Sequence, residues 1–387
     1  RSGCSMRKTV FLMLAFLAFL GPAWARDEIV PTPPEFVLDK QLPGEDPYWI
    51  YRPTFSPDGK LVAGFMSSSR ILTVWDVKTG QVLKQIGPEV HLYPDSLDGL
   101  EFSLDGSQLL TLRSSHPLRF IDWKNGKVVR EIALNADPRK IMDYTFSPDM
   151  GLLAVGTSKG IHLWDVKKGV KLKEFVTQVP VCAVDYLEYT PPKAARVRLL
   201  AYAKPLMPPD QVFKKVAGII NIDSGAITPL LDDVPEDKKI HGKMTFFRVR
   251  FEWGGSYLLI AYWTIPPQAD VKAGVFLLDP STGKYYANHD LGQLTVSYDP
   301  VYLGKPFWGF EVATANMLGD PYLTSAQFLV PTRKEGFKVL DTIPESTLAV
   351  QSLSINRGRS MAAVCVKKGP MDSSKLYLYK LVPKKLP

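Results

Sequence analysis

The sequence FSPDGKLVA at residues 55–63, followed by VWDVKTG at residues 74–80, recurs twice in modified form further along the chain. The second copy is FSLDGSQLL at 102–110 with FIDWKNG at 120–126, and the third is FSPDMGLLA at 146–154 with LWDVKKG at 163–169. The equivalent aspartates Asp76, Asp122 and Asp165 are 46 and 43 residues apart. A fixed period near forty residues predicts a β-propeller, in which each repeat forms one blade.

Each copy contains signals for four short strands. The first strand ends in phenylalanine, and Ser-Pro-Asp-Gly then turns the chain, because proline presets φ and glycine accepts a positive φ. The strand before each repeated aspartate is rich in Ile, Leu and Val, which favours burial on both faces. A turn ending in glycine, such as Thr79-Gly80, leads to a more polar outer strand. The pattern therefore predicts four-stranded antiparallel blades.

Weaker copies of this pattern continue to the end of the chain. Residues 219–223 and 275–279 mark a fourth and a fifth blade, residues 294–343 a sixth, and residues 349–381 a seventh that is one strand short. Residues 35–42 predict a lone strand before the first blade, and this strand can close the ring by supplying the missing one. We expect an all-β, seven-bladed β-propeller of four-stranded antiparallel blades, closed by the N-terminal strand.

The start of the chain has the pattern of a secretory signal peptide. Arg7 and Lys8 precede an apolar run over residues 10–20, and the small-residue pattern that follows predicts cleavage near Ala25. Residues 1–5 precede Met6 and are excluded from fold reasoning. We predict upstream residues and a leader over 1–25, a proline-rich lead-in over 26–34 and a single propeller domain over 35–387. An uncleaved membrane anchor is the alternative, although the run is shorter than the roughly twenty residues that span a bilayer.

Composition and motifs exclude several classes of site. The chain has 387 residues and a net charge of +8 but no long Lys/Arg tract, so a nucleic-acid surface has little support. Its five histidines are scattered singly, and phosphate-binding glycine loops and Cys-x-x-Cys pairs are absent. We therefore predict no metal and no cofactor. Cys182 and Cys365 fall in separate blades, and we predict two buried free thiols.

One motif suggests catalysis, but its context opposes this interpretation. Gly156-Thr157-Ser158-Lys159-Gly160 matches the nucleophile elbow of serine hydrolases, which requires a serine between a strand and a helix. The residues that follow predict another strand, so we expect a plain hairpin turn. His162 lies within that apolar strand and is predicted to be a core or interblade residue.

The three clear repeats, at residues 52–175, resemble those of the tryptophan-aspartate (WD) repeat propellers, as in Trp75-Asp76 and Trp164-Asp165. The Gly-His pair that this family places before the first strand is missing, although His91 and His241 stand near the expected position. Acceptors of the Asn-x-Ser/Thr type are absent, which fits a divergent, bacterial exported type. The resemblance implies a fold that mostly presents binding surfaces.

Three later blades have long connections between their second and third strands. These insertions lie at residues 204–215, 264–271 and 316–324, and in a propeller they would emerge on one face. Stiff, apolar, proline-rich tips lose little entropy on binding, so we predict a partner-binding loop face. Loop drift without function is the alternative. The candidate partner-binding residues are Tyr202, Met207, Pro208, Pro209, Asp210, Trp263, Pro266, Pro267, Gln268, Met317, Asp320 and Tyr322.

Taken together, these patterns predict an exported, non-catalytic β-propeller that acts as a protein or peptide interaction scaffold, in the periplasm or outside the cell. We expect a monomer that binds no nucleic acid and keeps no membrane span once the leader is removed. The alternative is a propeller enzyme of the lactonase or quinoprotein type, which would act through polar groups at the central channel.

Overall fold

Described residues of this computed structural model are 34–46, 50–66, 68–87, 99–112, 116–134, 141, 143–177, 180–190, 196–204, 217–231, 243–252, 257–265, 272–280, 282–293, 311–314, 325–332, 336–342, 349–356, 358, 360–367 and 373–383. Within these ranges every regular element is a β-strand, and the strands pair into antiparallel sheets. The predicted all-β class and antiparallel pairing are therefore confirmed.

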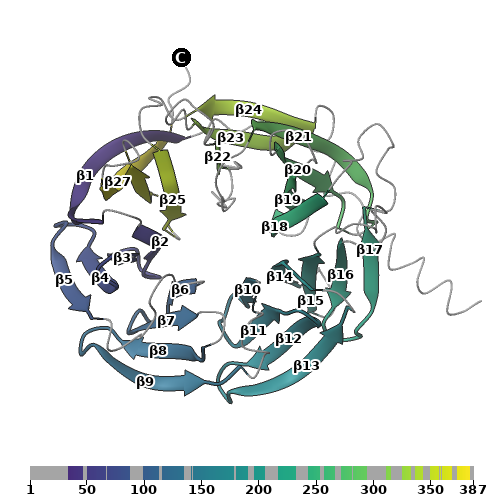
Figure 1. Ribbon diagram of the computed structural model, residues 1–387, viewed down its shortest axis with the longest axis horizontal. Helices are drawn as coiled ribbons and strands as arrows, with labels where there is room; N and C mark the ends of the chain where they lie inside the picture. The colour runs from purple at the N-terminus through teal and green to yellow at the C-terminus, as the bar shows by residue number, and fades with distance from the viewer. Residues whose placement is uncertain are drawn as a thin grey trace, which may run out of the picture. The chain divides into compact units, whose positions relative to one another are not determined.

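Each of the first five sheets in chain order has four strands (Figure 1). The first contains β2 (Ile50–Phe55), β3 (Leu61–Met66), β4 (Ile71–Asp76) and β5 (Val82–Ile86). The second contains β6 (Gly99–Phe102), β7 (Gln108–Leu112), β8 (Leu118–Asp122) and β9 (Lys127–Ile132). The third contains β10 (Asp143–Phe146), β11 (Leu152–Gly156), β12 (Gly160–Asp165) and β13 (Val170–Val176).

The fourth and fifth sheets repeat this order. The fourth contains β14 (Ala183–Tyr189), β15 (Val197–Ala203), β16 (Ala217–Asn221) and β17 (Ile227–Leu230). The fifth contains β18 (Lys243–Glu252), β19 (Tyr257–Ile265), β20 (Lys272–Leu278) and β21 (Tyr285–Gln293). A sheet with three described strands follows, made of β22 (Glu311–Thr314), β23 (Ser325–Thr332) and β24 (Gly336–Thr342).

The last sheet joins the two ends of the repeat region. It contains β25 (Ala349–Ile355), β26 (Met361–Lys367), β27 (Ser374–Pro383) and β1 (Pro34–Asp46), in the order β1-β27-β26-β25. In the antiparallel register of β1 and β27, Lys40 lies opposite Leu378. The strand predicted before the first repeat therefore exists and pairs with the final strand, whereas the number of blades and the closure of the ring stay predictions.

The repeated Ser-x-Asp sequence closes the hairpin between the first and second strands. Ser56 Oγ donates a hydrogen bond to Asp58 Oδ1 at 2.7 Å and accepts one from Leu61 N at 2.9 Å. The bond from Ser56 is the main cause that lowers the pKa of Asp58. Equivalent bonds join Ser103 to Asp105 and Ser147 to Asp149. One local network thus sets the same turn in all three clear repeats.

Apolar clusters lie between consecutive sheets. Phe65 and Leu72 of the first sheet are fully buried and pack with Leu100, Phe102 and Leu109 of the second. Corresponding clusters join the second sheet to the third, the third to the fourth and the fourth to the fifth, while another joins the last sheet to the first. Burial on both faces explains why the second and third strands are almost wholly apolar. The core is therefore a series of layers between neighbouring sheets.

Candidate functional site

The repeated aspartate after the third strand organises the turn into the outer strand. Asp76 Oδ1 accepts hydrogen bonds from Thr79 N at 2.7 Å and Thr79 Oγ1 at 2.9 Å, and the backbone bond is the main cause that lowers the pKa of Asp76. Asp165 Oδ1 accepts from Lys168 N at 2.8 Å. Gly80 then adopts φ 74°, a left-handed conformation that favours glycine. The turn therefore fixes where the outer strand begins to pair with the third strand of its sheet.

Each of the outer strands β5, β9 and β13 contains a β-bulge at the same point. The register of β4 with β5 places Lys84 opposite Val74 and Val82 opposite Trp75, so Leu83 is the extra residue. In the same way Val129 is the extra residue of β9 and Leu172 that of β13. A bulge re-aims the side chains beside it and leaves the extra residue outside the ladder. Leu83, Val129 and Leu172 are accordingly 47%, 52% and 47% exposed.

A cation follows the bulge and reaches the next sheet. Arg130 in β9 donates from Nη2 to the carbonyl oxygens of Val166 and Lys167, at 2.5 and 2.8 Å. Lys173 in β13 donates from Nζ to the carbonyl oxygen of Ile222 at 2.6 Å, in the β16–β17 turn. These acceptors lie in turns that lead to the next outer strand. The cations therefore tie the edge of one sheet to the edge of the next.

The other two cations of the series occupy equivalent places. Lys40 in β1 donates from Nζ to the carbonyl oxygen of Lys78 at 2.6 Å, in the β4–β5 turn. The end of the Lys84 side chain lies beside Gly126 in the β8–β9 turn, and a Cβ at Gly126 would be 3.4 Å from Lys84 Cε. In three of the four turns a glycine with positive φ lies at the contact, namely Gly80, Gly126 and Gly169; Gly225 of the β16–β17 turn also has a positive φ but has no atom within 4 Å of a Cβ placed there.

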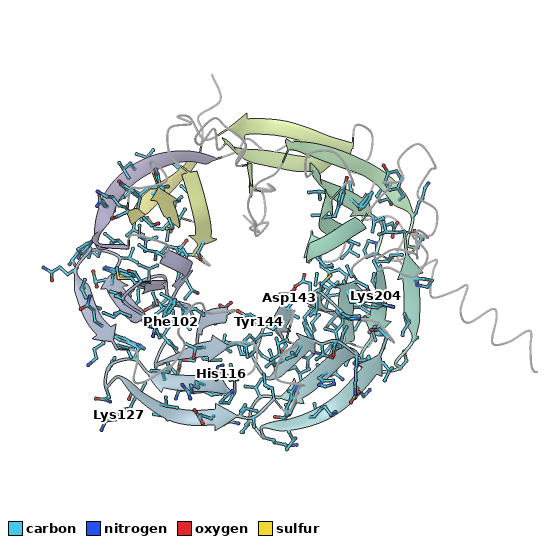
Figure 2. The ribbon with its side chains drawn as sticks, viewed as in Figure 1. Phe102, His116, Lys127, Asp143, Tyr144 and Lys204 are labelled. Atoms are coloured by element: carbon cyan, nitrogen blue, oxygen red, sulfur yellow. The ribbon has the colours of Figure 1, made fainter. Side chains whose placement is uncertain are left out.

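We define the outer rim as the exposed aliphatic and basic side chains of β5, β9, β13 and the turns that precede β9 and β13. Its aliphatic members lie in the strands. Its basic members lie in the turns before β9 and β13 or near the starts of these two strands. Figure 2 shows Lys127, at the start of β9, pointing away from the sheet. The members are Val82, Leu83, Lys124, Lys127, Val128, Val129, Lys167, Lys168, Val170, Lys171, Leu172 and Val176; Lys173 is also exposed but is counted with the cations that bind the next sheet.

The first strands carry acidic groups with structural partners. Asp143 of β10 is buried, and its Oδ2 accepts a hydrogen bond from Val184 N of β14 at 2.9 Å (Figure 2). Asp185 of β14 accepts from Phe251 N of β18 at 2.8 Å and from Thr145 Oγ1 at 3.4 Å. These carboxylates bind backbone groups of the following sheet. These hydrogen bonds between neighbouring sheets explain the positions of Asp143 and Asp185.

The predicted loop face lies almost wholly outside the described residues. Two of its insertions fall between β15 and β16 and between β19 and β20, the second and third strands of their sheets, and the third joins β22 to β23. Trp263 lies in β19, opposite Thr245 and Ala273. The members outside the described residues are Met207, Pro208, Pro209, Asp210, Pro266, Pro267, Gln268, Met317, Asp320 and Tyr322.

Tyr202 differs from the place expected of a partner-binding residue. It lies in β15 with 4% of its surface exposed, because its ring packs against Gly218 of the neighbouring β16. Burial raises the pKa of its hydroxyl. Lys204 Nζ stands 5.6 Å from the ring centroid. In this conformation Tyr202 is a core residue that supports the start of the loop, and direct contact with a partner is not available to it.

Other residues singled out in the sequence have clear positions. Gly156 to Gly160 form a hairpin turn between β11 and β12, in which Thr157 N donates to Gly160 O at 2.7 Å, as predicted. His162 is buried in β12, as predicted, with its Nε2 3.6 Å from Glu174 Oε2; burial is the main cause that lowers its pKa. Cys182 and Cys365 are both buried free thiols, which confirms that prediction.

Two absences apply to the described ranges. No group of three or more His, Cys, Asp or Glu side chains there is arranged to hold a metal ion. No helix long and apolar enough to cross a membrane occurs there either. His91 and His241, the candidates for the histidine of the WD repeat, lie outside the described residues.

Curated proteins similar to this chain include WD repeat and SOCS box-containing protein 1 from several vertebrates. The Mus musculus protein is 35% identical over 121 residues, and the Homo sapiens protein 32% identical over 120 residues. Each match covers 30% of this chain and 27% of the relative, so the chain spans about a quarter of the length of these relatives. This similarity and the four-stranded antiparallel sheets fit a WD-repeat propeller. No known protein-family profile matches the chain.

Sequence reasoning missed the outer rim. One signal for the outer strands was the spacing of the basic residues Lys40, Lys84, Arg130 and Lys173, which occupy the same position of successive outer strands and border the rim. A second signal was the aliphatic pair Val82-Leu83, which Val128-Val129 repeats at the same point of the next outer strand. Both signals need the strand register before they acquire a meaning.

Proposed function

We propose that this protein is an exported, non-catalytic β-propeller scaffold that binds a protein or peptide partner. The observation that carries the proposal is the recurrence of exposed aliphatic side chains, Leu83, Val129 and Leu172, at equivalent bulges of three consecutive outer strands. Exposed apolar groups that gather on one surface commonly mark contact sites. The similarity to WD repeat and SOCS box-containing proteins supports the same kind of role.

Export is part of this proposal and rests on the leader pattern over residues 7–25. Expression of the full chain in a bacterial host with a secretory pathway tests it. We expect the mature N-terminus near Arg26 in the periplasmic or secreted fraction. A mature chain that keeps residues 10–20 and stays with the membrane contradicts cleavage and favours the anchor.

The binding role is tested with the immobilised mature chain and a displayed library of random dodecapeptides. We expect reproducible enrichment of peptides that then bind the chain in solution with a Kd of about 1–100 μM, which corresponds to about 5–8 kcal/mol. A second chain, with short turns grafted over residues 205–215, 266–271 and 316–324, separates the loop face from the outer rim. Loss of binding in the grafted chain assigns the site to the loop face. Absence of any enriched peptide, or turnover of lactones by the purified chain, contradicts the scaffold role.

A further inference from the structure

The outer rim is continuous from one sheet to the next. Arg130 holds β9 against the turn that begins at Val166, and the end of Lys84 lies beside Gly126 in the turn before β9. The aliphatic residues of one outer strand are therefore followed directly by the start of the next. A binding partner can contact side chains of β5, β9 and β13 together.

The backbone edge of the rim is not suited to strand addition. β5, β9 and β13 are each the last strand of their sheet, so within the described part of the chain one side of each has no ladder partner. Each strand is interrupted by a bulge, and lysines stand on or beside it. Bulges and edge lysines are the features by which proteins prevent edge-to-edge pairing. The rim is therefore expected to bind through its side chains.

The charge of the rim is positive toward solvent. Lys127 and Lys167 are exposed, and no ion pair to either occurs within the described ranges. The nearby carboxylates of Asp76, Asp122 and Asp165 accept backbone hydrogen bonds of their own turns. Two rim lysines have acidic partners, Lys168 with Asp165 at 3.7 Å and Lys171 with Glu174 at 2.6 Å. Basic residues still outnumber acidic ones in these strands and turns, so the net charge of the surface stays positive. Complementary charge on a partner is therefore negative, which speeds encounter and favours the correct partner.

The apolar members of the rim favour a protein partner over a bilayer. All large hydrophobic residues that are exposed in the described part of the chain are Val, Leu or Ile. Surfaces that insert at a bilayer interface combine basic residues with Leu and with the aromatic residues Trp, Tyr or Phe, and these aromatic residues are missing from this exposed set of described residues. Short aliphatic side chains on a rigid sheet lose little conformational entropy, so they suit a contact with another protein.

We propose that the outer rim docks an acidic protein segment that bears aliphatic side chains, by side-chain contacts across β5, β9 and β13. This proposal deepens the scaffold function and rests on it. Val128, Val129 and Leu172 bury their apolar surface against the segment, while Lys127 and Lys167 pair with its carboxylates. Arg130 and Lys173, the cations that bind the next sheet, keep the strands aligned but do not contact the partner.

The test uses the mature chain, the dodecapeptide library and two double variants. Val129→Thr with Leu172→Thr removes apolar surface at residues that tolerate a β-branched replacement. Lys127→Glu with Lys167→Glu reverses the charge. Leu104→Thr is the matched control, since Leu104 is a 41% exposed aliphatic residue of the β6–β7 turn and is not a member of the rim. Thermal unfolding of each variant verifies that it folds.

We expect enriched peptides to be rich in Asp, Glu, Leu, Ile and Val. Fluorescence polarisation is expected to show at least a tenfold loss of affinity for each double variant and no change for Leu104→Thr. Added salt is expected to weaken the binding of the peptides to the unmodified chain, because it screens the charged contacts. Peptides that bind both double variants unchanged overturn the rim proposal and leave the scaffold function standing. Absence of any binding peptide overturns both.

A second arm uses vesicles of phosphatidylcholine with phosphatidylserine, without peptide. We expect no binding of the mature chain to these vesicles at physiological salt. The proposal is overturned if the vesicles bind the unmodified chain but neither double variant, while the peptides bind both double variants unchanged. The surface is then assigned to an anionic bilayer.

Discussion

Replacing Arg130 with methionine tests the link between neighbouring sheets. Arg130 Nη2 donates to the carbonyl oxygens of Val166 and Lys167, and its guanidinium lies 5.0 Å from the centroid of the Phe120 ring. Methionine keeps an unbranched apolar stem over Phe120 but removes both donors and the charge. The carbonyl oxygens lose their partner, and the turn before β13 loses its contact with β9.

The expected loss follows from these contacts. A hydrogen bond from a charged donor contributes about 1.5–3 kcal/mol when buried, and a cation above an aromatic ring adds about 0.5–1 kcal/mol at an exposed site. Arg130 is only half-buried, so water replaces part of both terms. We expect Arg130→Met to lower the free energy of unfolding by about 1–2 kcal/mol. Arg130→Lys keeps one charged donor and is expected to lose about half as much.

Urea unfolding followed by tryptophan fluorescence measures this difference. Lys127→Met is the matched control, because Lys127 is an exposed cation on the same strand and has no hydrogen bond to the next sheet among the residues that the structure describes. We expect the control to change the free energy of unfolding by less than about 0.5 kcal/mol. Equal effects of Arg130→Met and Lys127→Met would refute the idea that the cation after the bulge ties adjacent sheets.

Three further predictions follow from other contacts. Gly160→Ala is expected to destabilise the folded chain by several kcal/mol, because a Cβ would collide with the Phe175 carbonyl oxygen. Gly225→Ala is expected to cost only the strain of a left-handed alanine, about 1–2 kcal/mol, because no atom lies within 4 Å of the added Cβ, and equal losses in thermal unfolding contradict this difference. The bond from Ser147 is the main cause that lowers the pKa of Asp149 in the folded state, so the ionised carboxylate stabilises the fold above the ordinary carboxyl pKa near 4, and this stabilisation is lost as the pH falls. Asp149→Asn should therefore flatten the dependence of the free energy of unfolding on pH from about pH 5 to 3, and an unchanged dependence contradicts this role of Asp149. A carbodiimide should couple Asp39 to Lys380, whose charged atoms are 2.6 Å apart, within one chain; a coupling found only between two chains contradicts the β1–β27 sheet as a single-chain feature.

The sequence was most informative where structure depends on near neighbours. The Ser-Pro-Asp-Gly turn and the Asp76 turn are local networks, so their residue types alone predicted strands and hairpins in the first three repeats. The same reasoning separated the turn at Gly156 from a nucleophile elbow. The prediction that Cys182 and Cys365 are buried free thiols rested on their positions in separate repeats, and it is confirmed.

Sequence reasoning failed where a feature depends on pairing between distant strands. The bulges at Leu83, Val129 and Leu172 are visible only once each outer strand is aligned with its neighbour. Arg130 reaches carbonyl groups 36 and 37 residues away, a contact that no local pattern predicts. Tyr202 was assigned to the loop face because it precedes the insertion, yet its ring is buried against the adjacent strand.

Hydrogen–deuterium exchange of the mature chain, with and without a selected peptide, tests most directly whether the outer rim is the binding surface. Amides of β5, β9 and β13 are the reporters, because these edge strands have one side free of a ladder. If the outer rim is the binding surface, the peptide slows exchange in residues 82–86, 127–132 and 170–176. Slower exchange confined to residues 205–216, 266–271 and 315–324 would contradict it and assign binding to the loop face.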